Sequence, residues 1–191
     1  DGTTDITRTY PLGELTEDEK RFYTWTLQSH IDLARAVWLD YCECKMIDTI
    51  AREPLWRHLI NYRCGTGHSV SFVGNVHEGP HALNSRNTTR MRPGMVVTDE
   101  PGVYETDLVG IRIENELVCI HKADNQYGTF LGFEPLTFVP IATSPILPGV
   151  LDKDELAWLN DYHRQVFAKL APHLNAEERV WLAEKCASIG C

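Results

Sequence analysis

The protein has 191 residues, 43% of them hydrophobic, and its 18 Lys and Arg residues against 27 Asp and Glu residues give a formal net charge of −9. This length suits one domain, or one domain with an appendage, and the composition is sufficient to bury a sizeable core. The acidic balance argues against nucleic acid and against an anionic membrane surface as partners. No apolar run is long enough to cross a bilayer.

Six cysteines are spaced irregularly, at positions 42, 44, 64, 119, 186 and 191. A protein of this size does not need disulfides to fold, so we expect reduced thiols and a cytoplasmic location. Cys42 and Cys44 have no second Cys or His pair nearby and are interpreted as two ordinary thiols at a helix end. The chain opens at Asp1 with neither a methionine nor a signal peptide, so we interpret it as part of a longer protein.

The first element expected is a strand over residues 3–10, because β-branched and polar side chains alternate there. This alternation would place Asp5 on the same face as Thr7 and Thr9. A capping box at residues 16–19 then opens a long helix. Its apolar stripe is predicted to comprise Leu27, Ile31, Ala34 and Trp38.

A second helix is expected from about residue 45 to 60, broken or restarted at Pro54. The next seventy residues contain short β runs separated by Gly and Pro turns, most clearly at 95–98 and 111–118. Residues 133–148 are expected to be extended, and two capped helices follow, opened by Asp152 and Asn175, the second ending near Gly190. Because helices and strands do not alternate as βαβ units, the predicted class is α+β.

The segment from His77 to His81 matches the H-E-x-x-H signature of zinc proteases in sequence only. That signature requires a helix, on which positions i and i+4 share a face. Gly79 and Pro80 lie inside the required turn, and a proline in a helix interior costs ~3 kcal/mol. We therefore reject the helical zinc interpretation and expect another role for His77.

Four acidic or imidazole side chains lie in settings where an isolated charge is costly, namely Asp5, His68, Glu100 and Glu114. Asp5 lies in the first strand, and His68 follows a Gly-Thr-Gly segment that allows close backbone approach. Glu100 ends an apolar strand before a Pro-Gly turn, and Glu114 is expected in the middle of a strand. A pair of divalent ions would neutralise such buried charge. From these residues alone, a metal-dependent hydrolase and four unrelated structural side chains remain equally open.

Four segments resemble the catalytic motifs of the aminopeptidase P family of Xaa-Pro aminopeptidases: DGTTDITRT, GTGHSVSFVGNVHEGP, GMVVTDEPGVYE and GIRIENELV. The tail, EPLTFVPI followed by LAWLNDYHRQVF, is similar to the C-terminal extension of the longer members. The resemblance covers essentially the whole chain. It implies a pita-bread fold, N-terminally truncated here, with an antiparallel sheet flanked by helices over residues 1–132 and a C-terminal helical extension over 133–191.

The resemblance also implies a site. In the family, two Asp, one His and two Glu hold two divalent ions, usually manganese, with zinc or cobalt as alternatives. By motif match, four of these five ligands are present as Asp5, His68, Glu100 and Glu114, of which Asp5 and Glu114 would bridge both ions. His77 matches the histidine that contacts the substrate near the scissile bond. Arg112 matches an arginine that could steady Glu114 or Asp5 from behind the ligands.

The implied activity is hydrolysis of the N-terminal Xaa-Pro peptide bond by a hydroxide that bridges the two ions. An oxygen-rich donor set with one imidazole suits manganese better than metals that prefer thiolates. The implied partners are peptides with proline in second position, and a homodimer through the last two helices follows from the same likeness.

Three features depart from the family pattern. The other Asp ligand lies before Asp5 in the family and outside this chain, so the ligand set is incomplete, and we expect weak or absent metal binding and little activity from these 191 residues alone. Cys64 stands where many members have a histidine, and a thiol cannot carry the same proton at neutral pH. Ser69 replaces a glycine beside His68.

Two alternatives stay open. An Xaa-Pro dipeptidase would use the same ligands, although the long tail favours the aminopeptidase. A pita-bread protein that has lost its metals could instead serve as a binding module. Cys64 and the serines near His68 favour that interpretation, and the four retained ligands oppose it.

Overall fold

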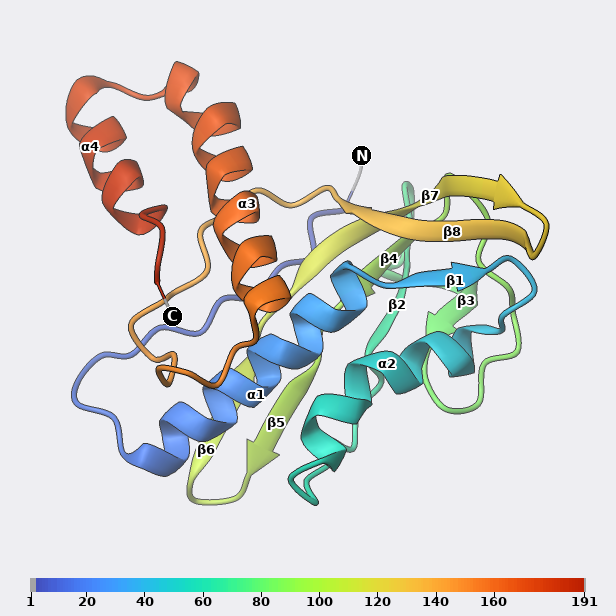
Figure 1. The fold of residues 1–191 in the computed structure, drawn as a ribbon, viewed down its shortest axis with the longest axis horizontal. Coiled ribbons are helices and arrows are strands. Elements are labelled where there is room, and N and C mark those ends of the chain that lie inside the picture. The colour runs from blue at the N-terminus through green and yellow to red at the C-terminus, as the bar shows by residue number, and fades with distance from the viewer. Residues whose placement is uncertain (1–2, 191) are drawn as a thin grey trace.

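A computed structural model describes residues 3–190 (Figure 1). The helices and strands follow one another as α1 Glu17–Ala34, β1 Val37–Leu39, α2 Cys44–Trp56, β2 Gly67–Val70, β3 His77–Leu83, β4 Val96–Asp99, β5 Gly102–Glu105, β6 Val109–Arg112, β7 Asn115–Asn125, β8 Gly128–Pro135, α3 Lys153–Leu170 and α4 Ala176–Lys185. A short 3-10 turn at Ala171–His173 joins the last two helices.

Six strands form one antiparallel sheet in the order β1-β8-β7-β4-β2-β3, so β1 and β3 are its edge strands within residues 3–190. Within the described part of the chain, strands β5 and β6 pair only with each other. Helices α1 and α2 pack side by side across one face of the sheet, and α3 and α4 project beyond it at the upper left of Figure 1.

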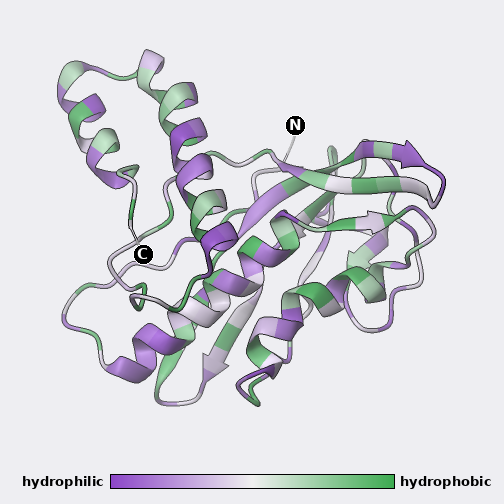
Figure 2. Cartoon of the chain, viewed as in Figure 1, coloured by the Kyte–Doolittle hydropathy of each residue, from purple (hydrophilic) through white to green (hydrophobic). Residues whose placement is uncertain are grey.

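Two apolar clusters hold these layers together. One lies between α2, the end of α1 and the sheet, and includes Leu33, Ile47 and Leu117, which are fully buried. The other joins α1 and β6 to the C-terminal helices, with Leu27 and Leu159 at its centre. Figure 2 shows hydrophobic and hydrophilic segments alternating along α3 and α4, as expected for helices that bury one face. The C-terminal helices are therefore packed onto the body through α1.

The predicted strand over residues 3–10 is wrong as a ladder, because this segment makes a single bridge, between Thr7 and Glu114. Hydroxyl groups hold it instead: Thr3 Oγ1 donates to the Ser71 carbonyl at 2.9 Å, and Thr9 Oγ1 donates to the Arg112 carbonyl at 2.9 Å. Side-chain hydrogen bonds therefore hold this segment in place of a strand ladder.

The first helix begins at its predicted capping box but ends at Ala34, so the assignment of Trp38 to its stripe is wrong. Trp38 lies in β1, and its ring centroid is 4.5 Å from that of Phe133. Trp38 follows Ala34 at helical spacing only by chance. A separation of four residues also places two side chains on the same face of a strand, so this spacing does not distinguish a helix from a strand.

Pro54 neither breaks nor restarts the second helix, which runs continuously and ends two residues later. Ala51 and Leu55 are fully buried beside it, so tertiary packing overrides the local penalty of the proline. The last helix is shorter than predicted and ends at Lys185 rather than near Gly190.

The segment from His77 to Leu83 is strand β3, which confirms that the H-E-x-x-H match is not helical. Cys42, Cys44, Cys64, Cys119 and Cys186 are all free thiols, while Cys191 lies outside the described residues.

Among residues 3–190, none of the helices combines the length and the apolar composition needed to span a membrane.

Candidate metal centre

Glu100 and Glu114 lie at the two places where the chain passes from the main sheet to the β5–β6 hairpin. Strand β4 pairs with β7 up to Asp99 and Asn115, whereas β5 pairs with β6 from Gly102 and Arg112 onward. The predicted single strand over 111–118 is therefore wrong: it is divided at Ile113–Glu114, where the chain changes its pairing partner. This change of partner brings the two glutamates, fourteen positions apart in sequence, to opposite sides of one junction.

Glu114 is only 1% exposed, and its backbone N–H donates to the Thr7 carbonyl at 3.0 Å. The Thr7 hydroxyl also donates to Glu114 Oε2, and Arg112 Nε lies 3.5 Å from the same oxygen. Burial raises the pKa of Glu114 to about 7, and the nearby negative charges of Glu100 and Asp5 contribute to the shift. A buried carboxylate among like charges is a position where a cation would be stabilising.

His68 lies between two of the other carboxylates. Its Nε2 is 3.1 Å from Glu100 Oε1 and 3.4 Å from Asp5 Oδ2. Burial would lower the pKa of His68, but the hydrogen bond to Glu100 and the charge of Asp5 raise it overall. For Glu100, burial is outweighed by hydrogen bonds from His68 and Thr98, so its pKa is lowered.

Gly67 allows β2 to approach β4 at this site. A Cβ atom at this position would lie 1.8 Å from the Thr98 carbonyl oxygen, a distance that no side chain could occupy. The close approach lets the His68 N–H donate to Thr98 Oγ1 at 3.0 Å, while that hydroxyl donates to Glu100 Oε1 at 2.9 Å. One threonine therefore binds both the main chain of His68 and the carboxylate of Glu100.

Asp5 is held at the open side of the cluster. Its backbone N–H donates to Glu116 Oε1 at 2.9 Å, and its side chain is 24% exposed. Burial raises the pKa of Glu116, and the neighbouring charge of Asp5 contributes. Glu116 thus adds a fourth carboxylate beside Asp5, Glu100 and Glu114.

His77 and Arg112 line the same cluster. The ring of His77 packs edge-on against that of His68, with centroids 3.9 Å apart, and its side chain is exposed to solvent. Arg112 Nη1 is 3.7 Å from Glu100 Oε2, and its Nε donates to Thr7 Oγ1 at 2.8 Å. Arg112 therefore contacts both glutamates, and through Thr7 it supports the segment that carries Asp5.

Cys64 and Ser69, the two residues that depart from the family pattern, lie close to the cluster. Cys64 is exposed, its Sγ is 3.7 Å from the Gly102 carbonyl oxygen, and partial burial raises the pKa of its thiol. Ser69 is buried on β2 and pairs with Val97 of β4. The serine is therefore accommodated within the ladder and does not separate the two strands.

The chemistry of the donor set fits a divalent cation. Three converging carboxylates and one imidazole are hard ligands, and Glu114 is buried among charges of its own sign. Within residues 3–190, however, no group of three or more His, Cys, Asp and Glu side chains is arranged to hold a metal ion as it stands. His68 and Arg112 instead contact the carboxylates at the distances given above.

Sequence reasoning missed Thr98 and Arg8, which support the predicted ligands. Thr98 could have been found, because it lies two residues before Glu100 in a strand and so shares its face. Arg8 lies in the motif DGTTDITRT, but nothing in that motif indicates its contact, in which its side chain donates to the Glu114 carbonyl oxygen at 2.7 Å.

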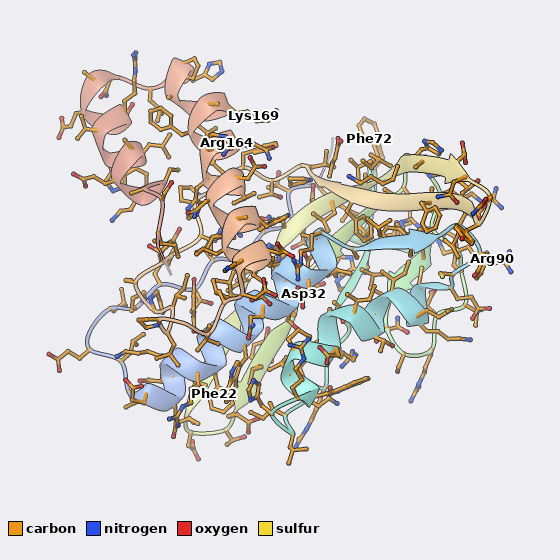
Figure 3. The ribbon with its side chains drawn as sticks, viewed as in Figure 1. Phe22, Asp32, Phe72, Arg90, Arg164 and Lys169 are labelled. Carbon is orange, nitrogen blue, oxygen red and sulfur yellow. The ribbon has the colours of Figure 1, made fainter. Side chains whose placement is uncertain are left out.

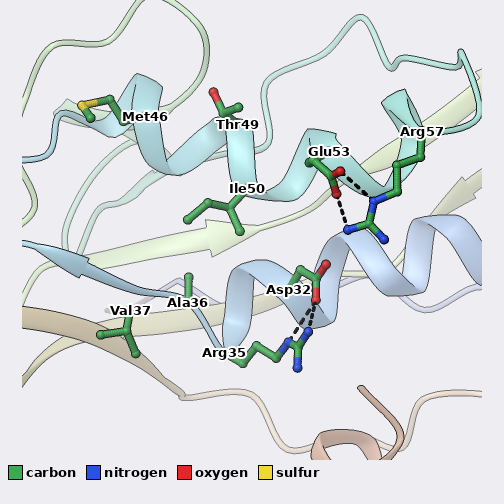
Figure 4. A pocket seen from close by; sticks show the side chains of 9 residues that line it. All are labelled: Asp32, Arg35, Ala36, Val37, Met46, Thr49, Ile50, Glu53 and Arg57. Carbon is green, nitrogen blue, oxygen red and sulfur yellow. Dashed lines mark hydrogen bonds and ion pairs between the residues drawn. The ribbon is translucent and has the colours of Figure 1, made fainter. Parts of the chain in front are cut away.

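Two other surface features adjoin or face away from this cluster. Figure 3 shows Phe72 on the loop between β2 and β3. This loop precedes His77, and Phe72 is 76% exposed. A separate hollow between α1, α2 and β1 is drawn in Figure 4, where Arg35 pairs with Asp32 and Arg57 with Glu53. None of the predicted site residues lines that hollow, and its charges are already paired.

This fold and this junction of carboxylates belong to a known class of enzymes. Residues 1–121 match the model of metallopeptidase family M24, and residues 129–189 match the C-terminal region of peptidase M24. The chain therefore belongs to metallopeptidase family M24, and it has the pita-bread fold of that family.

Individual proteins within this family are also similar to the chain. A probable Xaa-Pro aminopeptidase P from Laccaria bicolor is 41% identical over 197 residues, which cover 99% of this chain and 31% of that protein. The crystal structure of the X-prolyl aminopeptidase from Caenorhabditis elegans, described as a cytosolic enzyme with a di-nuclear active site, is 38% identical with a TM-score of 0.92, covering 99% of this chain and 32% of that one.

A prolidase from Pyrococcus furiosus is 28% identical with a TM-score of 0.61 and covers 71% of this chain and 37% of its own. Similarity to the L. bicolor and C. elegans proteins thus extends over nearly the whole chain, whereas similarity to the prolidase covers 71% of it. The chain spans about a third of the length of the curated relatives it matches.

Proposed function

We propose that this chain is the C-terminal part of an Xaa-Pro aminopeptidase, which releases the N-terminal residue from peptides that carry proline in second position. The observation that carries the proposal is the placement of His68 Nε2 at 3.1 Å from Glu100 and 3.4 Å from Asp5, with the buried Glu114 across the same junction. Similarity to aminopeptidases over 99% of the chain supports the same assignment.

The proposed ligands for two divalent ions are Asp5, His68, Glu100 and Glu114, with Mn²⁺ as the ion. Such ions would polarise a peptide carbonyl and lower the pKa of a water molecule, so that hydroxide is available near neutral pH to attack the carbonyl carbon. The family resemblance places a fifth carboxylate outside these residues. The proposal therefore includes weak metal binding and little activity for residues 1–191 alone.

The remaining site residues act on the substrate or on the ligands. His77 is solvent-exposed and packs against His68, so its imidazole is available to donate a hydrogen bond to the substrate carbonyl as negative charge develops there. Arg112 lies within ion-pair distance of both glutamates and limits their movement. The exposed loop at Phe72 offers an apolar surface beside His77 for a substrate side chain.

Metal binding and peptide hydrolysis test this proposal. Mn²⁺ affinity is measured by calorimetry on this chain and on a longer protein that carries the fifth ligand, with Glu114→Gln and, as a matched control two residues further along the chain, Glu116→Gln, in which the glutamine oxygen can still accept the Asp5 N–H. Glu114→Gln is expected to weaken binding by more than about 100-fold, because even residues behind the ligands contribute 10–100-fold. Glu116→Gln is expected to change it little.

Hydrolysis distinguishes the alternatives. The longer protein with Mn²⁺ should cleave a tripeptide with proline in second position faster than the corresponding dipeptide. Preference for the dipeptide would instead support a dipeptidase. A longer protein that binds no divalent ion would leave a metal-free binding module as the better proposal, and full turnover by residues 1–191 alone would contradict the incomplete ligand set.

The proposal also includes a domain boundary, a cellular location and an oligomeric state. The catalytic region is proposed to end near residue 132 and the C-terminal extension to occupy 133–191, which is supported by the separate family matches. A cytoplasmic location is supported by the free thiols among the described residues and by the description of the C. elegans enzyme as cytosolic. Exposed Val180 and Trp181 on α4 support a homodimer through the last two helices, which sedimentation velocity would test.

A further inference from the structure

Arg8 connects the segment that carries Asp5 to the backbone of a proposed ligand. Its Nη1 donates to the Glu114 carbonyl oxygen at 2.7 Å, and its Nη2 donates to Asn115 Oδ1 at 2.8 Å. Arg8 follows Thr7, whose carbonyl oxygen accepts the Glu114 N–H. Arg8 and its neighbour Thr7 therefore bind both the carbonyl oxygen and the N–H of Glu114.

The same guanidinium is held from its far side by the C-terminal region. Arg8 Nη2 shares its two hydrogens among three acceptors, because besides Asn115 Oδ1 it lies 2.9 Å from the Tyr162 hydroxyl and 2.7 Å from the Val139 carbonyl oxygen. Arg8 Nε donates to the Pro140 carbonyl at 3.1 Å. A planar group with five donors in a fixed fork is immobilised when several acceptors surround it. These acceptors all belong to residues after β8, within the second of the two family matches.

Tyr162 is itself rigidly placed in α3. It is 1% exposed, and its ring stacks on that of Trp158 at a centroid separation of 5.3 Å and an angle of 4°. Its hydroxyl lies 3.0 Å from the Thr137 and Val139 carbonyl oxygens, to one of which it donates while accepting from Arg8. A buried hydroxyl with this many partners has little freedom to follow a displaced arginine.

We propose that Tyr162 is a positioning residue for the metal centre: through Arg8, the C-terminal region sets the position of the Glu114 backbone. The hydrogen-bond connection stands on geometry alone, while its consequence for metal affinity rests on the proposed function. The C-terminal extension thereby has a role at the active site that its distance from the ligands would not indicate.

Amide hydrogen exchange tests the connection without any metal. In Tyr162→Phe, which removes only the hydroxyl, exchange of the Glu114 amide is expected to accelerate about tenfold relative to the amide of Ile31 in α1, since one buried hydrogen bond is lost. The matched control is Tyr23→Phe: Tyr23 is 2% exposed, and its hydroxyl donates to the Ala142 carbonyl at 2.6 Å. It ties α1 to the same C-terminal segment without bonding to Arg8, so the Glu114 and Ile31 amides should change in parallel.

Mn²⁺ affinity, followed by electron paramagnetic resonance of the free ion, provides the second measurement. Tyr162→Phe is expected to weaken binding about tenfold and Tyr23→Phe to leave it unchanged. Parallel changes at the two amides in Tyr162→Phe, or equal effects of the two variants on affinity, would overturn the inference. If the wild-type protein binds no metal even when it carries the fifth ligand, the proposed function fails, and hydrogen exchange still decides the role of Tyr162.

Discussion

Asp99 and Asn115 face each other across β4 and β7, and each is the chain neighbour of a proposed metal ligand, Glu100 and Glu114. His30 of α1 contacts both: its Nδ1 lies 3.0 Å from Asp99 Oδ2, and its Nε2 lies 3.3 Å from Asn115 Nδ2. All three side chains are fully buried. One helix residue therefore contacts the two strands on which the glutamates depend.

Loss of this imidazole should leave a buried carboxylate without a partner. Burial raises the pKa of Asp99 to about 6, so at pH 8 the group is ionised. We expect His30→Leu to lower the free energy of unfolding by roughly 3 kcal/mol at pH 8 in urea denaturation. In the double variant with Asp99→Asn, the loss should be smaller than the sum of the two single losses. Additive losses would show that the pair is not coupled.

Gly67 and Gly65 lie in the same Gly-Thr-Gly motif but differ in the space available for a Cβ atom. A Cβ at Gly67 meets the Thr98 carbonyl at 1.8 Å, whereas at Gly65 its nearest neighbour is the Leu83 carbonyl oxygen at 3.6 Å, an ordinary contact. Gly67→Ala is therefore expected to cost about 3 kcal/mol or more, because β2 must move away from β4 and carry His68 with it. Gly65→Ala should cost less than about 1 kcal/mol. Thermal unfolding of the two variants checks this, and equal losses would contradict the close approach.

Leu59 should be a site of simple stabilisation. Its backbone φ is 58°, in the left-handed region, and its side chain is 97% exposed, so it contributes strain without packing. Leu59→Gly is expected to raise the free energy of unfolding by about 0.5–1 kcal/mol, since relief of strain exceeds the added entropy of the unfolded chain. Asp107, at φ 59°, is the control: aspartate tolerates this region better, so Asp107→Gly should gain less. A larger gain at Asp107 would refute the explanation.

His163 should make the protein sensitive to acid. It is fully buried, its Nε2 accepts the Ile141 N–H at 3.1 Å, and burial together with the charge of Arg8 lowers its pKa to about 4. Between pH 6.5 and 4 the unfolded chain therefore binds a proton that the folded chain does not, and stability falls as pH decreases through this window. The loss should reach roughly 3 kcal/mol.

His163→Gln isolates this contribution, because the glutamine oxygen can accept the same N–H without titrating. Carboxylates also titrate in this range, so the quantity to measure is the difference between wild type and variant in the dependence of unfolding free energy on pH. That difference should be largest between pH 4 and 6.5. Parallel curves would show that His163 is not buried in its neutral form.

The starts of the helices were predicted well, because capping boxes are local signals, whereas the end of the last helix and the effect of Pro54 were not. Thr16 and Asp152 cap α1 and α3 as expected. Strand boundaries near the site were predicted less well. The division at Glu114 arises because the chain changes its pairing partner, and this depends on where β4 and β5 lie rather than on residues 111–118. The proposed ligands could be listed from motifs, but Arg8 and Tyr162 are 154 positions apart and carry no pattern that indicates their contact.

The two outer strands of the main sheet have a consequence for behaviour at high concentration. Strand β1 has only three residues, and β3 contains Pro80, which offers no N–H to an incoming strand, along with the charged Glu78. Neither edge strand is therefore a good template for addition of a strand from another molecule. We expect concentrated solutions to resist fibril growth through this sheet, so any self-association would arise elsewhere on the surface.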